Sequence, residues 1–309
     1  NCVVKTLSMP TIQIQNDSLV QIKNCKIYGT KNPALQVSNK SQVESVGTTF
    51  SNCATSIINI TNEAAGSFSH CIFNESRNGG VTSSESSYLI IDNCTFTHSM
   101  VEFRSSSTGC AINNCTLSND SLIKTNNNCT NVTISRNNLS DSFVQIDGSS
   151  TSVLNSNRYN SSSLIVRGTS ISTLDNEFFT GKVESSIRVI ENAKIVIKNS
   201  ILSYITGFGI VSYDSSNLTV DKCQFKNISN NSIISHSGCD VTLSNLIFQN
   251  SIQTPIVFNS IIQANLSQIR VESSKSNGCE INGCQKHVKI SESHFQSNSK
   301  CGLVLSNNS

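Results

Sequence analysis

A short unit with a cysteine at its centre recurs along the chain every 20 to 24 residues, and this spacing restricts the folds open to the chain more than any other feature. The unit consists of a small or polar residue, the cysteine, one polar residue and a large apolar residue. Self-similarity at a fixed period of this length is typical of a solenoid, in which each repeat buries its apolar face against the next. Clear copies surround Cys25, Cys71, Cys94, Cys115 and Cys223.

The large apolar residue of the unit can be followed through nearly the whole chain. Successive positions are 19 to 24 residues apart, which predicts thirteen coils. A second short apolar run follows nearly every one of them. The expected core positions are Ile27, Phe50, Phe73, Phe96, Leu117, Leu139, Tyr159, Phe178, Ile201, Phe225, Phe248, Val271 and Phe295.

The apolar runs have the pattern of β-strands. In residues 93–96, polar and apolar residues alternate with period two, which places Cys94 and Phe96 on one face. Asn, Ser, Gly and Asp fill the stretches between the runs, as turns require. Leucine-rich repeats have a similar period, but their regular leucine pattern is absent. The sequence predicts an all-β fold, a right-handed parallel β-helix solenoid of about 13 coils, because parallel crossovers are nearly always right-handed.

We expect residues 1–309 to form a single β-helix solenoid. The length alone would allow two domains, but no linker interrupts the period. Asn1 lies within repeat-like sequence, and Ser309 follows directly on an apolar run. The end of a solenoid exposes unpaired strand edges, which proteins normally cover. We therefore expect the chain to be a segment of a longer protein, or to pack against something else.

Composition argues against some partners. The net charge is +2 and only 14% of residues are charged, whereas a nucleic-acid-binding protein needs a basic stripe. No apolar run of about 18 residues is present, so no membrane span is expected in this segment. Nothing in the sequence calls for a cofactor.

The residue two positions before each core position forms a column of its own. Where this residue is cysteine, we expect buried free thiols, because stacked neighbours have Cβ atoms slightly too far apart for a bridge. A metal site would need ligands that converge, which a straight column does not provide. Where it is asparagine, we expect the amides to bond to one another along the stack. The predicted ladder is Cys25, Cys71, Cys94, Cys115, Asn137, Asn157, Asn176, Asn199 and Cys223.

Two further cysteines, Cys279 and Cys284, flank a turn-like stretch of four residues in an enlarged interval. This arrangement is compatible with a disulfide that closes the loop. Zinc is not expected there, because the sequence lacks partner cysteines or histidines at zinc-finger spacing.

A polysaccharide lyase or hydrolase on a β-helix needs two or more carboxylates on one face. The 20 acidic residues scatter instead: Glu102 and Asp147 fall in different columns, and no two adjacent coils place acids in one column among those compared. The five histidines also fall in different columns. No catalytic residues are predicted.

Sixteen Asn-x-Ser/Thr sequences occur in the chain and are compatible with secretion. Against secretion stands an odd number of cysteines, 13, although thiols in a dry core resist oxidation. We favour an extracellular or cell-surface location over a cytoplasmic assembly. The candidate N-glycosylation sites include Asn93, Asn114, Asn131, Asn138, Asn217 and Asn227.

With these coils in place, the chain resembles the pectate-lyase-like right-handed β-helix repeat proteins over nearly its whole length. Residues 225–227 and 295–298 resemble the Phe-x-x-Asn element of polymorphic outer-membrane-type repeats, and residues 79–81 their Gly-Gly-Ile element. The Asn- and Ser-rich composition is also similar to that of large β-helical surface proteins of some protists. These resemblances imply adhesive or architectural roles.

We therefore predict a non-enzymatic structural or adhesin-like segment of a large surface or extracellular protein. Its polar face would bind glycans, other protein segments or copies of itself. Two alternatives stay open: a polysaccharide lyase or hydrolase, and an intracellular structural module docked in a filamentous assembly.

Overall fold

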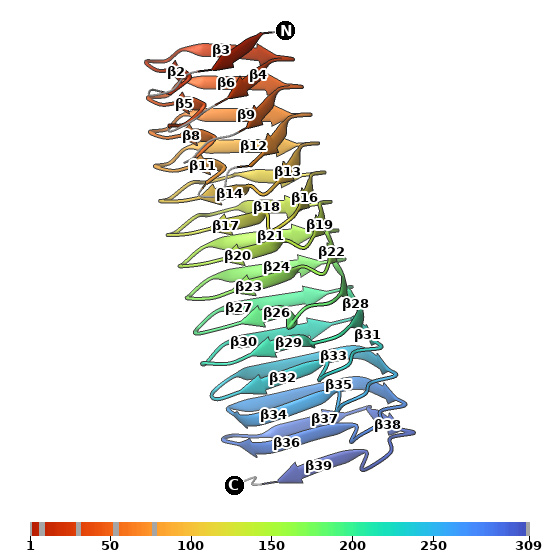
Figure 1. Ribbon diagram of the computed structural model, residues 1–309. Helices are drawn as coiled ribbons and strands as arrows, with labels where there is room; N and C mark the ends of the chain where they lie inside the picture. Colours follow the sequence, from red (N-terminus) through yellow and green to blue (C-terminus); the bar gives the residue numbers. More distant parts are fainter. Residues whose placement is uncertain (1, 6–9, 29–31, 52–55, 76–78, 307–309) are drawn as a thin grey trace. The chain divides into compact units, whose positions relative to one another are not determined.

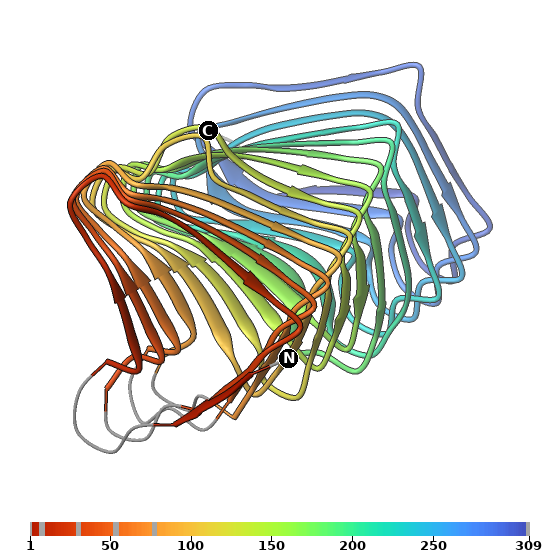
Figure 2. The same ribbon diagram turned by 90° about the horizontal axis from the view of Figure 1, so that it is seen from above.

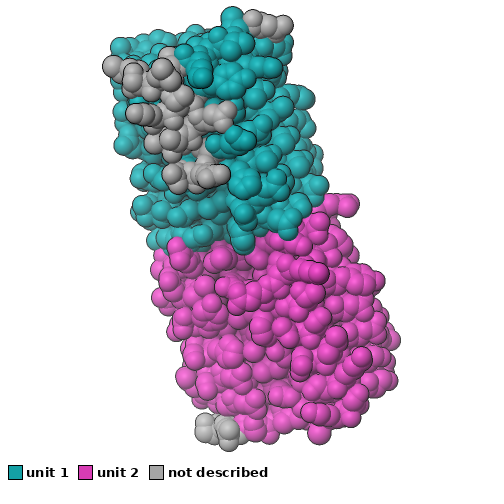
Figure 3. All heavy atoms as spheres, viewed as in Figure 1, with its two compact units in different colours: residues 1–153 teal, residues 154–309 magenta. Residues whose placement is uncertain are grey.

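The computed structural model describes residues 2–5, 10–28, 32–51, 56–75 and 79–306. These residues form β-strands and turns, and no helix is present among them. A search of the same residues for a helix able to cross a membrane found none. The chain divides into two compact units, residues 1–153 (unit 1) and 154–309 (unit 2), coloured in Figure 3. Each unit is described by itself, and the single continuous solenoid expected above remains a prediction.

Both units are built from parallel coils, about thirteen in total. A typical coil gives two strands to one sheet, called sheet A, and one strand to a second sheet, called sheet B (Figures 1 and 2). The all-β solenoid expected from the sequence period is confirmed. Its strands are short because each coil must turn a corner every few residues.

The strands of unit 1 fall into three columns. The first column of sheet A contains β3 (Leu19–Lys23), β6 (Gln42–Val46), β9 (Ala65–Ser69), β12 (Tyr88–Asp92), β15 (Ala111–Asn113) and β18 (Val132–Ser135), and β21 (Thr151–Asn155) lies across the unit boundary. The second column of sheet A contains β1 (Val3–Lys5), β4 (Lys26–Tyr28), β7 (Thr49–Ser51), β10 (Ile72–Asn74), β13 (Thr95–Thr97), β16 (Thr116–Ser118) and β19 (Asn138–Ser140). Sheet B contains β2 (Ile12–Ile14), β5 (Leu35–Val37), β8 (Ile58–Ile60), β11 (Val81–Ser83), β14 (Met100–Phe103), β17 (Leu122–Thr125) and β20 (Phe143–Ile146).

Unit 2 repeats this arrangement. The first column of sheet A contains β24 (Ile171–Asp175), β27 (Lys194–Lys198), β30 (Asn217–Asp221) and β37 (Val288–Ser291), and the second contains β22 (Arg158–Asn160), β25 (Phe178–Gly181), β28 (Ile201–Ile205), β31 (Gln224–Lys226) and β38 (His294–Gln296). Two longer strands, β33 (Asp240–Gln249) and β35 (Gln263–Glu272), run through both columns. Sheet B contains β23 (Ser163–Val166), β26 (Ser185–Val189), β29 (Phe208–Ser212), β32 (Ile233–His236), β34 (Ile256–Ile261), β36 (Cys279–Cys284) and β39 (Leu303–Ser306).

The core positions stack in register, one above another. In unit 1, Phe50 pairs with Phe73 and Phe73 with Phe96, and all three side chains are fully buried. Their rings stack at centroid distances of 5.4 and 4.6 Å. In unit 2, Phe225 and Phe248 stack at 4.7 Å. These contacts bury large apolar areas in every coil, and such burial is the main force that holds a solenoid together.

Two predicted core positions are wrong by one residue. Tyr159 pairs with Phe179, not with Phe178, and Phe179 pairs with Leu202, not with Ile201. Phe179 and Leu202 are fully buried, whereas Ile201 is 36% exposed on the outer face. Each site has two adjacent large apolar residues, so period-two alternation fits either choice.

The corner between the two strand columns of sheet A contains one left-handed residue in every coil compared. The φ angles of these residues lie between +49° and +61°. Asparagine is enriched there because its short polar side chain tolerates this conformation better than most. The residues are Asn24, Gly47, His70, Asn93, Asn114 and Arg136 in unit 1, and Ser156, Asn176, Asn199, Lys222, Asn245, Gln268 and Glu292 in unit 2.

Candidate functional site

The residue that follows each left-handed corner residue points into the solenoid, and we call this column the corner ladder. In unit 1 the Cys71 backbone N–H donates to Cys94 Sγ (3.3 Å), and the Cys94 N–H donates to Cys115 Sγ (3.4 Å). The Cys115 N–H donates to Asn137 Oδ1 at 2.8 Å, and Asn137 Nδ2 donates to the Ile112 carbonyl at 3.0 Å. Cys94, Cys115 and Asn137 therefore each accept a backbone N–H from the preceding coil.

The ladder thiols are buried and chemically quiet. Cys71, Cys94 and Cys115 are free and at most 2% exposed, whereas Cys25 is half-buried. The hydrogen bond with Cys115, together with burial, raises the pKa of Cys94 to about 12. The pKa of Cys71 is also raised, first by its hydrogen bond with Cys94 and then by burial. Protonated thiols are poor nucleophiles and poor metal ligands, and the structural role expected for this column remains a prediction.

In unit 2 the ladder differs from the prediction. Asn157 and Cys223 face inward, but Asn176 and Asn199 are exposed, because the one-residue shift puts them at left-handed corner positions. The buried positions in these two coils are Glu177 and Ser200. Asn176 Nδ2 instead donates to Ser156 Oγ (3.1 Å), and Asn199 Nδ2 donates to Asp175 Oδ1 (2.7 Å).

The buried residues of this stretch form their own chain of bonds. Asn157 Nδ2 donates to Glu177 Oε1 at 3.1 Å. The Glu177 N–H donates to Ser200 Oγ at 3.0 Å, and the Ser200 N–H donates to Cys223 Sγ at 3.4 Å. Glu177 thus puts a carboxyl group at a ladder position where other coils have a thiol, an amide or a hydroxyl group.

The expected disulfide between Cys279 and Cys284 is wrong. Both thiols are free and buried, and they lie at the two ends of strand β36. Five residues of extended chain separate their Cα atoms by about 16 Å, far beyond bridging range. Among the described residues, no group of three His, Cys, Asp or Glu side chains is placed to hold a metal ion.

A groove runs along unit 2 where successive turns lead from sheet A to sheet B. These turns follow β31, β33, β35 and β38, and the cavity between their side chains has a volume of about 600 Å³. We call it the turn groove. It is lined by Asn227, Ser229, Asn250, Ile252, Ser273, Ser274, Lys275, Ser297 and Ser299.

The turn groove presents polar side chains that the protein itself leaves available. The backbone amides of its turns are occupied from coil to coil, as when the Asn250 N–H donates to the Glu272 carbonyl (3.2 Å) and the Lys275 N–H to the Ser251 carbonyl (2.9 Å). Within the described structure, seven of its polar side chains make no hydrogen bond or ion pair: Asn227, Ser229, Asn250, Ser273, Lys275, Ser297 and Ser299. One apolar side chain, Ile252, is 47% exposed beside them.

The outer face of sheet B in unit 1 carries a second polar patch. Strand pairing aligns Glu102 with Lys124, and Lys124 with Gln145, on three successive coils. Glu102 is only 3% exposed and forms an ion pair with Arg104. Asp147 is 4% exposed and accepts a hydrogen bond from Gln145 Nε2 at 2.6 Å. Two carboxylates on the outer side of a sheet are therefore shielded from solvent, which the sequence analysis did not anticipate.

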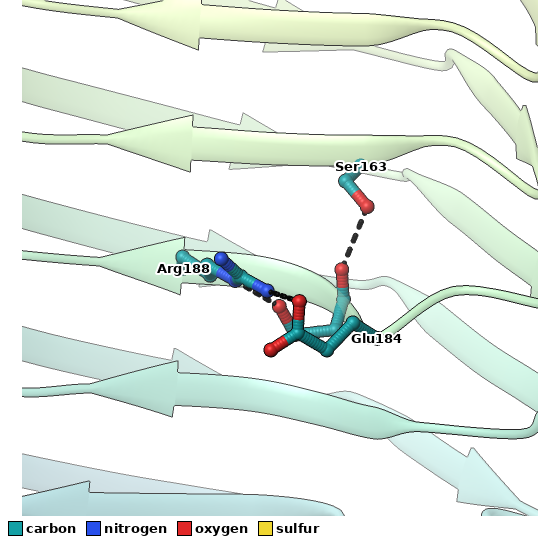
Figure 4. A network of polar contacts seen from close by, with 4 residues as sticks. Ser163, Glu184 and Arg188 are labelled. Atoms are coloured by element: carbon teal, nitrogen blue, oxygen red, sulfur yellow. Dashed lines mark hydrogen bonds and ion pairs between the residues drawn. The ribbon is translucent and has the colours of Figure 1, made fainter.

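Sheet B of unit 2 has a different outer surface. Figure 4 shows a polar network there: Arg188 forms an ion pair with Glu184, and Ser163 Oγ donates to the carbonyl of Ser185 at 2.7 Å. Arg188 Nε also donates to Ser185 Oγ. These groups satisfy one another, so this network holds adjacent coils together and offers little to a ligand.

The candidate glycosylation sites are placed but not tested by the structure. Asn93, Asn114, Asn131, Asn138 and Asn217 are exposed, and Asn227 is half-buried in the turn groove. The amides of Asn93 and Asn114 both donate to the Asp92 carboxylate, at 2.7 Å each. Glycosylation remains a prediction for all six.

The family model described as "Right handed beta helix region" matches residues 10–159, 144–252 and 185–309. The chain belongs to this family. The right-handed winding predicted from the sequence is thereby confirmed, whereas the resemblances to outer-membrane-type and protist proteins remain predictions. No curated protein matches the sequence significantly.

A comparison with solved structures finds that the chain is similar in fold to a family 28 exopolygalacturonase from Yersinia enterocolitica. It is 9% identical, with a TM-score of 0.50 over 98% of this chain and 78% of that one. The periplasmic alginate epimerase AlgG is 9% identical over 97% of this chain and 78% of that one, with a TM-score of 0.38. The tailspike of E. coli bacteriophage HK620, in complex with a pentasaccharide, is 11% identical over 98% and 71%, with a TM-score of 0.26.

The prediction that the protein is not an enzyme is contradicted by this comparison. The exopolygalacturonase shares the fold over almost the whole of this chain. The scatter of acidic residues in the sequence therefore does not exclude an enzyme.

Proposed function

We propose that the β-helix protein binds polysaccharide in the turn groove of unit 2. The observation that supports this is the set of seven polar side chains facing a cavity of about 600 Å³ without partners in the described structure. That volume lies within the usual range of ligand sites. We further propose an extracellular or cell-surface location, where such ligands are met.

The chemistry of the groove suits a sugar. Serine hydroxyls and asparagine amides both donate and accept, as sugar hydroxyls do. Ile252 supplies an apolar surface for the C–H face of a ring. Because equivalent groups recur at each coil, about 4.8 Å apart, the groove suits a ligand that also repeats. Self-association and protein binding, the other roles expected from the sequence, have no comparable observation in their support.

The test is a polysaccharide array followed by calorimetry with two double variants. Asn250→Ala/Lys275→Ala removes two groove groups, and Asn217→Ala/Lys289→Ala removes the same residue types from the exposed outer face of sheet A. Loss of two hydrogen bonds should weaken binding about 10-fold or more, while the control should stay within about 2-fold of wild type. Absence of binding to any polysaccharide, or equal losses in both variants, would contradict the proposal.

A second candidate function, cleavage of a glycan, is favoured by Glu102 and Asp147. Acid–base hydrolysis of a glycosidic bond uses two carboxyl groups, and Glu102 on β14 and Asp147 just after β20 lie two coils apart in unit 1. Release of reducing ends by the wild type should fall about 100-fold or more in Glu102→Gln and in Asp147→Asn. Asp120→Asn, which changes an exposed turn, is the matched control. No activity in the wild type rules this candidate out and leaves the binding proposal standing.

A further inference from the structure

Glu177 is a carboxyl group buried in the corner ladder of unit 2. Its residue is 1% exposed, and one oxygen, Oε1, is held by Asn157 Nδ2 at 3.1 Å. Its neighbours along the buried chain of bonds, Asn157 and Ser200, are neutral. A buried carboxylate is costly unless its charge is compensated, and this one has no cation bonded to it within the described structure.

The second carboxyl oxygen of Glu177, Oε2, lies in the core, and its carboxyl group is close to the hydroxyl group of Tyr159. Oε2 is buried without a hydrogen-bond partner in the described structure, and so is the hydroxyl of Tyr159. The Tyr159 ring is fully buried and stacked on Phe179 at 4.1 Å with an interplanar angle of 8°, so its position is fixed. The two groups interact: burial, followed by the charge on Glu177, raises the pKa of Tyr159.

A small groove of about 310 Å³ lies beside this corner. It is lined by the ladder residues Asn157 and Glu177, by the corner residues Asn176 and Asn199, and by Phe178. Arg158 also lines this groove, while the Glu177 Oε2 atom itself is buried. The remaining charged groups near it, Arg158, Asp175 and Lys198, lie toward the outer side of the strands.

We propose that Glu177 is a proton-controlled latch: the neutral acid can stay buried in the closed corner, whereas the carboxylate, which has no cation bonded to it within the described structure, draws in water and loosens β22, β25 and their corner. Loosening replaces the hydrogen bond between Asn157 Nδ2 and Glu177 Oε1 by bonds to water, and no covalent step is involved. The latch would make the lower-numbered coils of unit 2 more compact in acid than in alkali.

The direction of the pH response follows from linkage. Burial raises the pKa of Glu177 from 4.5 to about 8, with the nearby Asp175 charge adding a smaller increase. Between these values the folded protein retains a proton that the unfolded chain releases. The stabilising effect of the neutral acid is therefore complete below pH 4.5, declines as pH rises, and is gone once pH exceeds about 8.

Hydrogen exchange followed by mass spectrometry at pH 5.5, 7 and 8.5, corrected for intrinsic rates, tests the latch. Protection of peptides covering residues 157–205 should fall at least 10-fold over this range in the wild type. Glu177→Gln should make protection independent of pH, while Glu191→Gln, which changes an exposed carboxylate in a turn, should keep the wild-type response.

If Glu177→Gln fails to fold, the carboxyl group can be followed directly. Carbon-13 NMR of wild-type protein labelled at glutamate should show one side chain titrating between pH 7 and 9. Three results would each overturn the proposal. They are protection of the wild type that does not depend on pH, a Glu177→Gln variant that keeps the wild-type pH response, and titration of every glutamate side chain near pH 4.5.

Discussion

The corner ladders of the two units perform the same structural task with different chemistry. In unit 1, Cys94, Cys115 and Asn137 each accept a backbone N–H from the coil before, and all are neutral. In unit 2, Ser200 and Cys223 do the same, but Glu177 brings in an ionisable group. The comparison teaches that thiol, amide, hydroxyl and carboxyl groups can all serve as the acceptor at this position, while Leu246 and Ile269 fill it with apolar side chains in two later coils of unit 2. It also predicts that only unit 2 responds to pH through its ladder.

The largest expected effect is a loss of unfolding free energy when an aromatic ring beside either ladder is removed, and it should differ between the two units. Phe73 packs between two rings, Phe50 and Phe96, whereas Phe225 stacks on Phe248 alone among the described aromatic residues. Replacement by alanine should cost about 3–5 kcal/mol at either site. Phe73→Ala should cost about 1–3 kcal/mol more, because it loses two additional aromatic pairs at about 0.5–1.5 kcal/mol each, including an edge-to-face contact with Phe68. Guanidinium unfolding measures both, and an equal or larger loss in Phe225→Ala would contradict the stacking account.

The next effect comes from the two ladder asparagines. Asn137→Leu should leave the Cys115 N–H and the Ile112 carbonyl unpaired, at about 1–3 kcal/mol each, at any pH. Asn157→Leu removes the donor to Glu177 Oε1. Its cost should grow as pH rises past about 8, the pKa of Glu177, because an ionised carboxylate needs the lost donor more than the neutral acid does. The free energy of unfolding of each variant is measured at pH 6 and pH 9. If it changes with pH in the same way in both variants, the predicted difference between the two asparagines is wrong.

A smaller effect is expected when one acceptor replaces another. Cys94→Ser retains an acceptor for the Cys71 N–H and should change the free energy of unfolding by less than about 1.5 kcal/mol. Cys94→Val has similar size but no acceptor, and should cost about 1–3 kcal/mol. If serine and valine are equally disruptive, the ladder is held by shape alone and the acceptor argument fails.

The smallest effect concerns reactivity rather than stability. Cys301 is exposed, whereas Cys110 and Cys223 are buried, with their pKa values raised to about 11 mainly by burial. A disulfide reagent should modify Cys301 in the native protein within minutes and reach the two buried thiols only on unfolding. Peptide mapping after brief treatment checks this, and modification of Cys223 at the rate of Cys301 would show that the ladder is open.

The fold could be predicted because a period near 22 residues is a physical requirement of coil stacking. Each coil must return an inward residue to the same place, so the spacing of Phe73 and Phe96 alone identifies them as stacked core residues. The residues of the corner ladder were harder to predict than the fold. At Phe178–Phe179 and Ile201–Leu202 both residues are large and apolar, and the preceding asparagines looked like ladder members although the left-handed corner selects them.

The candidate sites depend on contacts that no local pattern records. The turn groove lies between the side chains of four successive turns, and its Ser and Asn residues resemble those of every other turn. The shielding of Glu102 and Asp147 depends on neighbours from several coils. Only Glu177 left a signal that could have been used: the sole acidic residue in the ladder column once the register is corrected.

The most direct test of the proposed function is a crystal structure with a fragment of the polysaccharide that binds best in the array. The account predicts sugar density along the turn groove, with rings over Ile252 and hydroxyls against Asn250 and Lys275. Sugar bound on sheet B of unit 1 beside Glu102, with the turn groove left to solvent, would contradict it.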